Sequence, residues 1–211
     1  MKRYITEFLG TFFLVLTIGL CRVQGTPFAP LANGAALMVM VYMGGHVSGA
    51  HYNPAVSLAA MLRGKLAPGN FVPYVVAQLL GAMAAAGVVR GVLGQTFAAA
   101  PGPNATPLAA LAIEILFTFA LTLVVLNVAT SKKTQGNSYY GLAIGLTVTV
   151  GAFAGGAISG AAFNPAVGIG PMLVQVMTGT GTMANAWLYL VGPLAGGILA
   201  AGVFGMQEAG E

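Results

Sequence analysis

The sequence predicts an all-α membrane protein with six transmembrane helices and two short half-helices that enter the membrane without crossing it. Of the 211 residues, 57% are hydrophobic, 8 are basic and 4 are acidic. Soluble domains carry about 25% charged residues, so these charges are too few to cover a surface exposed to water. The chain also holds six long apolar stretches, and the nonapeptide SGAHYNPAV, which begins at Ser48, recurs as SGAAFNPAV from Ser159.

Each apolar stretch approaches the roughly 20 residues that a helix needs to cross the hydrocarbon core of a bilayer. None shows the alternation of apolar and polar residues that is typical of a membrane β-barrel. The expected spans are residues 4–21, 31–47, 71–93, 107–130, 139–158 and 186–206.

The basic residues predict the orientation of these spans. Six of the eight share one side of the membrane: Lys2, Arg3, Arg63, Lys65, Lys132 and Lys133. Because short cytoplasmic loops carry an excess of lysine and arginine, we expect both termini to be cytoplasmic. The net charge of +4 then reflects topology, and no basic cluster is long enough to indicate a nucleic-acid partner. The short tails carry no evident sorting signal, so we expect the inner (plasma) membrane of a prokaryote.

The two nonapeptides belong to a longer internal repeat. The segment EFLGTFFLVL begins at Glu7 and EILFTFALTL begins at Glu114, 107 residues later, whereas the nonapeptides lie 111 residues apart. We interpret residues 1–211 as a single domain made of two repeats, at about 1–100 and 107–211. Each repeat holds three spans, an odd number, so the two have opposite orientations. Inverted repeats place a solute site at their interface, near the midplane of the membrane.

The Asn-Pro pairs inside the nonapeptides indicate helix starts. An asparagine side chain accepts a backbone N–H at the N-cap, and proline suits the first helical position, where no N–H is needed. We therefore expect short helices at residues 54–62 and 165–177. The first would span about 14 Å, roughly half the membrane. The residues that form the two motifs are Asn53, Pro54, Ala55, Asn164, Pro165 and Ala166.

Two half-helices that enter from opposite faces would meet with their N-termini at the midplane. Each N-terminus carries about half a positive charge, so the meeting point repels cations. We expect the amide NH2 groups of Asn53 and Asn164 to be free to donate to a solute. The backbone carbonyls of residues 45–52 and 156–163 would supply a ladder of acceptors. The sequence therefore predicts a narrow path for small uncharged polar molecules.

The chain resembles the major intrinsic protein family, the aquaporins and glycerol facilitators, over residues 2–206. The duplicated Asn-Pro-Ala frame carries the resemblance, together with Glu7 and Glu114 in the first and fourth spans. The resemblance implies a channel domain in the lipid bilayer, a homotetramer with one pore in each chain, and passive flow of water and small neutral solutes without a cofactor. It also implies that the two glutamates accept hydrogen bonds from the re-entrant loops.

The titratable residues leave a second possibility open. A carboxylate inside a span is by default a candidate functional group, so Glu7 and Glu114 are also compatible with a proton-coupled transporter. We favour loop support, since the two occupy equivalent positions and no third acid or lysine lies in the middle of a span. His46 and His51 flank the first re-entrant loop. A histidine near a pore mouth is able to gate with pH, but we expect a fixed hydrogen-bonding role for both.

In this family a constriction on the outer side of the two asparagines sets selectivity. Counting from the asparagines, the resemblance places Asn33, Ala152, Ala161 and Val167 there. Water-selective members usually carry aromatic, histidine and arginine residues at these positions, and glycerol facilitators keep the arginine. Here Val167 stands in the arginine position, and a guanidinium would have supplied a fixed charge and several donors. We expect a wide, weakly polar filter that passes glycerol, urea and also water, with cations excluded by the half-helix termini alone.

A strict water channel, a non-conducting scaffold and a proton-coupled transporter are alternatives on the same fold. The sequence argues against an enzyme, because the spans hold no nucleophile–base set and no cluster of metal-ligating residues. We expect neither a cofactor nor a metal ion.

Overall fold

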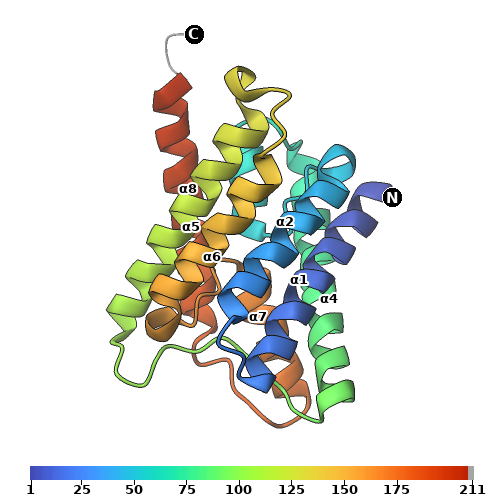
Figure 1. Cartoon of the computed structure of the whole chain (residues 1–211), viewed down its shortest axis with the longest axis vertical. Helices are drawn as coiled ribbons and strands as arrows, with labels where there is room; N and C mark the ends of the chain where they lie inside the picture. Colours follow the sequence, from blue (N-terminus) through green and yellow to red (C-terminus); the bar gives the residue numbers. More distant parts are fainter. Residues whose placement is uncertain (209–211) are drawn as a thin grey trace.

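The helices follow one order twice along the chain: two long helices, a short helix and a third long helix (Figure 1). The computed structural model describes residues 1–208. The first set consists of α1 (Lys2–Gln24), α2 (Ala29–Ser48), α3 (Pro54–Leu62) and α4 (Pro68–Leu93). The second set consists of α5 (Pro107–Thr130), the single turn η1 (Lys132–Thr134), α6 (Tyr140–Ser159), α7 (Pro165–Met177) and α8 (Ala186–Glu208). The predicted bounds of the two half-helices are confirmed.

Among the described helices, five are long and apolar enough to cross a membrane, namely α1, α4, α5, α6 and α8. The predicted span at α2 has 20 residues, as many as α6, but Asn33 and His46 make it more polar. Because it packs against both α1 and α6, we count it as a span by its length and position. The helices α3, with 9 residues, and α7, with 13, are too short to cross.

The short helices pack against long helices of the opposite half. Helix α3 lies against α8, and α7 lies against α4. Each half-helix is reached through a break in the preceding long helix, since α2 ends at Gly49 and α6 ends at Gly160, with φ of 86° and 87°. Glycine adopts this left-handed conformation without the steric cost that a Cβ would add. The two breaks therefore occupy equivalent places in the repeat.

The two halves meet where α2 crosses α6, and matched glycines form the crossing. A Cβ added to Gly34 would lie 2.5 Å from the carbonyl oxygen of Gly145, and one added to Gly145 would lie 2.4 Å from that of Gly34. This reciprocal contact has the same offset as the nonapeptides. Small residues allow such close approach where no hydrophobic force acts between helices. The predicted role of small residues is thus seen at the interface of the two halves.

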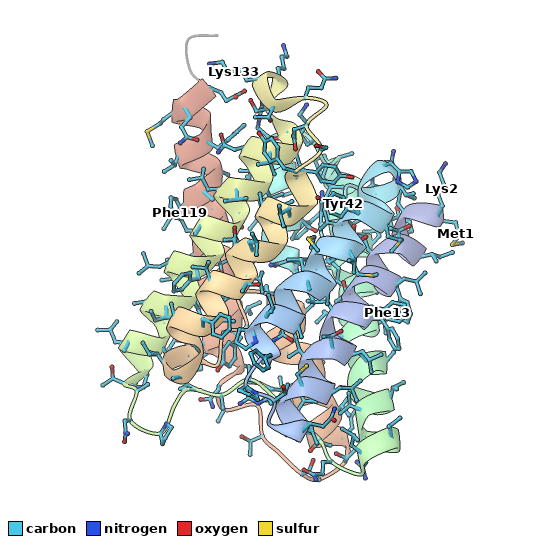
Figure 2. The ribbon with its side chains drawn as sticks, in the orientation of Figure 1. Met1, Lys2, Phe13, Tyr42, Phe119 and Lys133 are labelled. Carbon is cyan, nitrogen blue, oxygen red and sulfur yellow. The ribbon has the colours of Figure 1, made fainter. Side chains whose placement is uncertain are left out.

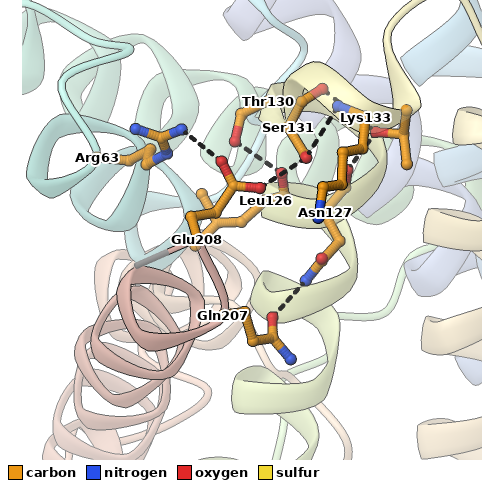
Figure 3. Close-up of polar contacts among 9 residues, drawn as sticks. Arg63, Leu126, Asn127, Thr130, Ser131, Lys133, Gln207 and Glu208 are labelled. Carbon is orange, nitrogen blue, oxygen red and sulfur yellow. Dashed lines mark hydrogen bonds and ion pairs between the residues drawn. The ribbon is translucent and has the colours of Figure 1, made fainter. Parts of the chain in front are cut away.

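Basic residues gather at one end of the molecule. Figure 2 shows Lys2 and Lys133 at the same end, where the last described turn of α8 also lies (Figure 1). There Glu208 accepts from Arg63 at 3.2 Å and from the Ser131 hydroxyl at 2.7 Å (Figure 3). The arrangement agrees with the expected placement of the basic loops on one side of the membrane. The C-terminal residue, expected on that side, lies outside the described residues.

Candidate functional site

The N-termini of α3 and α7 are capped by the two predicted asparagines. Asn53 Oδ1 accepts from the backbone N–H of Ala55 at 2.9 Å, and Asn164 Oδ1 accepts from that of Ala166 at 2.9 Å. Each asparagine has an extended backbone and a proline directly after it. The local chemistry of Asn-Pro therefore explains why both short helices begin where they do.

The amide groups of the asparagines cross between the two halves. Asn53 Nδ2 donates to the carbonyl oxygen of Phe163 at 2.9 Å, and Asn164 Nδ2 donates to that of Tyr52 at 2.8 Å. The expectation that both amides are free is therefore wrong in part. One N–H of each amide holds the opposite loop, and the second N–H remains, because a carboxamide has two donors.

The backbone directly before each asparagine is unusual. Ala50, Tyr52, Ala161 and Phe163 have φ of 51°, 50°, 52° and 49°, in the left-handed region that residues other than glycine rarely adopt. Such conformations cost on the order of 1–3 kcal/mol each, so the surrounding contacts must hold them in place. The sequence does not indicate this feature, since tyrosine and phenylalanine are not typical of left-handed backbone.

Glu7 holds the first of these segments. Its Oε1 accepts from Ser48 Oγ at 2.6 Å and from the N–H of His51 at 3.0 Å. Its Oε2 accepts from the N–H of Tyr52 at 2.7 Å and from Gln78 Nε2 at 2.8 Å. The side chain is fully buried, and its two oxygens thus face four donors. The geometry matches the expected role of support for the re-entrant loop.

Glu114 holds the second segment in the same way, with one donor fewer. Its Oε1 accepts from Ser159 Oγ at 2.7 Å and from the N–H of Ala162 at 3.0 Å. Its Oε2 accepts from the N–H of Phe163 at 2.6 Å. The position that corresponds to the glutamine donor of the first half is Pro193, which has no N–H to give. The two halves are therefore symmetric in their loops but not in the side chains behind them.

The expected ladder of backbone acceptors is shorter than predicted. Helix α2 continues to Ser48 and α6 to Ser159, so the carbonyls of the last helical turns bond within their own helices. Only the segments 49–52 and 160–163 leave regular structure before the asparagines. The ladder therefore has about half the expected length on each side.

Two cavities meet at the predicted constriction. An inner cavity of about 540 Å³ reaches both asparagines, and an outer cavity of about 980 Å³ lies between the end of α1, the start of α2 and the end of α6. The residues that line both cavities, called the boundary residues below, are Ile18, Asn33, Ala152, Ala161 and Val167. The four residues counted from the asparagines are thus brought together between the cavities. Glu7 and Glu114 line neither cavity.

Sequence reasoning missed Ile18. The residue lies on α1 four positions after Leu14, which lines the inner cavity. Side chains four residues apart share one face of a helix, so the spacing along α1 is the signal that could have found it. The family resemblance pointed only to α2, α6 and the second loop.

The boundary is weakly polar. Asn33 is the one polar side chain among the boundary residues, and its Oδ1 is buried without a hydrogen-bond partner in the described structure. Val167 is 5% exposed and offers neither charge nor donor. No lysine, arginine or carboxylate lines the inner cavity, whose wall is mainly aliphatic: Leu14, Leu37, Val56, Leu121, Val125, Ile144 and Val148. The path is suited to uncharged molecules.

Of the two predicted histidines, only His51 reaches a cavity. It lines the inner cavity, and its Nδ1 lies 3.1 Å from Ser57 Oγ, which fits a fixed hydrogen-bonding role. His46 is exposed in the last turn of α2 and lines neither cavity. The prediction that His46 flanks the path is therefore wrong, because the helix continues past it and turns its side chain away.

Opposed half-helices joined by an asparagine pair, below two cavities in series, define a membrane channel. The chain matches the family model described as Major intrinsic protein over residues 1–204. It belongs to the major intrinsic protein family, whose members are channels and not enzymes.

Individual relatives agree with this placement. The chain is 36% identical to aquaporin NIP1-1 of Zea mays over 216 residues, which cover 98% of this chain and 74% of the relative. It is 34% identical to nodulin-26 of Glycine max over 214 residues, which cover 97% and 77% of the two chains. The X-ray structure of the aquaglyceroporin from Plasmodium falciparum superposes with a TM-score of 0.86 at 26% identity, covering 96% of this chain and 94% of that chain.

Proposed function

We propose that this chain forms a passive channel for water and for small uncharged solutes of the glycerol and urea type. The observation that carries the proposal is the boundary between the cavities, which holds one amide and no charged group. A solute that leaves the outer cavity must pass this boundary before it reaches the asparagines. The similarity to proteins named aquaporin and to a structure titled aquaglyceroporin supports the same class of transport.

The filter proposed here is wide because its side chains are small. Val167 follows the second Asn-Pro-Ala motif, where an arginine would place a fixed charge and several donors. Ala152 and Ala161 complete the wall. A hydroxylated solute would then pair with the Asn33 amide at the boundary and with the remaining N–H groups of Asn53 and Asn164 further in.

The alternatives on the same fold have less support. A strict water channel needs a narrower and more polar boundary than these residues supply. A proton-coupled transporter needs carboxylates on the path, whereas Glu7 and Glu114 are buried behind the loops. A non-conducting scaffold gives no reason for two cavities that meet at the asparagines.

We further infer a homotetramer in the lipid bilayer, with one pore in each chain and the N-terminus on the cytoplasmic side. The exposed apolar side chains of the long helices, such as Val76, Leu80 and Val150, support burial against lipid or a neighbouring chain. The protein is an integral membrane protein. The relatives named above include plant proteins and give no support to the prokaryotic inner membrane, which stays a prediction.

Osmotic shrinkage of proteoliposomes, followed by light scattering, tests the proposed filter. Wild-type protein should raise water, glycerol and urea permeability above that of empty liposomes. Val167→Arg should lower glycerol and urea permeability about tenfold, the effect of about 1.4 kcal/mol at the boundary. Val92→Arg is the matched control, because Val92 is 68% exposed near the end of α4 and lines neither cavity.

The outcomes separate the filter from the channel. If Val167→Arg leaves glycerol permeability unchanged while water still passes, the wide-filter proposal is wrong. If the wild type passes none of the three, the channel proposal itself fails.

A further inference from the structure

The outer cavity carries an arginine, although the boundary below it has none. Arg22, in the last turn of α1, lines the outer cavity together with Cys21 and Thr26. Arg22 lies four residues after Ile18, and Ile18 lies four residues after Leu14. This spacing puts the three side chains on one face of α1, which therefore borders the path from the inner cavity outwards. About 6 Å of helix rise separates Arg22 from the boundary.

No described acidic side chain offsets this charge. Glu7 and Glu114 are buried against the re-entrant loops, and Glu208 pairs with Arg63 at the other end of the molecule. No carboxylate lines the outer cavity, and Arg22 has no ion pair or hydrogen bond within the described structure. A cleft with one sign of charge and walls of low dielectric shifts the local concentration of ions by about tenfold or more.

The ordinary explanations for an arginine at this place apply equally to Arg90. Both lie in the last turn of a long helix, where a cation interacts favourably with the helix dipole. Both are exposed, and both fall on the side to which charge statistics assign few basic residues. Only Arg22 lines a cavity, whereas Arg90 lines neither. Position on the path is the property that distinguishes the two arginines.

We propose that Arg22 is a charge-selectivity residue of this channel, which makes the outer cavity electropositive and keeps cations away from an uncharged boundary. The inference rests on the proposed channel function. It places the excluding charge one helical turn outside the boundary and on α1, whereas Val167 leaves none within the boundary. Cation exclusion is then shared between Arg22 and the half-helix termini, and the expectation that the termini act alone is replaced.

The chain contains its own reporter for this charge. Cys21 is the single cysteine of the sequence, it is partly buried, and it lines the same cavity. The test compares the rates at which an anionic and a cationic methanethiosulfonate of similar size modify Cys21, with the protein in lipid nanodiscs that leave both faces open. The intrinsic reactivity of the thiol cancels in the ratio of the two rates.

We expect the wild-type ratio to favour the anionic reagent about tenfold over the ratio for a free thiol in solution. Arg22→Gln should return the ratio to the free-thiol value, and Arg22→Lys should preserve it. Arg90→Gln is the matched control and should leave the ratio unchanged. The preference should also shrink at 1 M salt, where the Debye length is about 3 Å instead of about 10 Å at 0.1 M.

Equal ratios for Arg22→Gln and Arg90→Gln would overturn the proposal, as would failure of both reagents to reach Cys21. Glycerol shrinkage of liposomes made from the same preparations tests the channel function separately. Arg22→Gln should pass glycerol at the wild-type rate, which also shows that the variant folds. Loss of glycerol permeability in the wild type would instead remove the channel function, and with it the reason for a selectivity residue.

Discussion

Asn53 and Asn164 each serve both halves of the molecule. The oxygen caps one half-helix, and an amide N–H bonds to the loop before the other half-helix. Glu7 and Glu114 then hold the loops in a backbone conformation that few residues adopt. The centre of the membrane is thus built from four polar side chains with reciprocal partners.

Glu114→Gln should destabilise the protein. The new amide nitrogen would face a backbone N–H of the second loop, at Ala162 or Phe163, and a buried donor without an acceptor costs about 1–3 kcal/mol. Thermal unfolding in detergent should show a lower Tm. Thr118→Val, one turn further along α5, removes a buried hydroxyl that has no partner among the described residues, and it should not lower Tm. Equal losses for the two variants would contradict the role assigned to Glu114.

Asn33→Ala should lower glycerol permeability without lowering stability. The variant removes the one polar side chain of the boundary, and a lost hydrogen bond of about 1 kcal/mol reduces the rate about fivefold. Folding should not suffer, because Asn33 Oδ1 is buried without a partner in the described structure. Shrinkage assays and thermal unfolding measure the two effects. A rise in glycerol permeability would show that the side chain acts only as an obstacle.

Among the elements, the half-helices were predictable and the loops before them were not. Asn-Pro determines a helix start through local chemistry, so the bounds at 54–62 and 165–177 agree with the observed helices. The left-handed residues Tyr52 and Phe163 depend on glutamates more than 40 residues away in sequence. Such long-range partners leave no local pattern. The same reason explains why His46 was misplaced, since nothing near it marks the end of α2.

Gly145→Ala should weaken the contact between α2 and α6. The added Cβ would lie 2.4 Å from the backbone oxygen of Gly34, and backbone cannot move aside as a flexible side chain does. Overpacking of this kind costs about 1–3 kcal/mol, so Tm should fall. Gly87→Ala is the control, because nothing lies within 4 Å of its added Cβ, and the lower entropy of the unfolded chain should stabilise it by about 0.5 kcal/mol. A neutral Gly145→Ala would contradict the close crossing.

For the molecule as a whole, the repeat in the sequence predicted the arrangement better than any single motif. The offset of the nonapeptides recurs in the glycine contact between α2 and α6, which lies at the interface of the halves. The four filter positions followed from the family resemblance, and they lie together between the cavities. Ile18 and Arg22 did not follow from it, because they lie on α1, where no motif is found.

Glu208→Gln should have a small effect on stability. Glu208 joins the end of α8 to Arg63 after α3 (Figure 3), but the side chains are 22% and 30% exposed, and solvent-exposed pairs contribute about 0–1 kcal/mol. Arg63 also lies 4.9 Å from the centre of the Phe204 ring, a contact that the variant keeps. Chemical unfolding at low and high salt should show a loss below about 1 kcal/mol that shrinks with salt. A loss of several kcal/mol would contradict this estimate.

Glycerol permeability of wild-type proteoliposomes, measured with and without a proton gradient of either sign, tests the central claim most directly. The account predicts a permeability well above that of empty liposomes, linear in the glycerol gradient and unchanged by the proton gradient. A permeability equal to that of empty liposomes would leave only a scaffold. A saturating flux that follows the proton gradient would make the protein a coupled transporter and would contradict the passive channel.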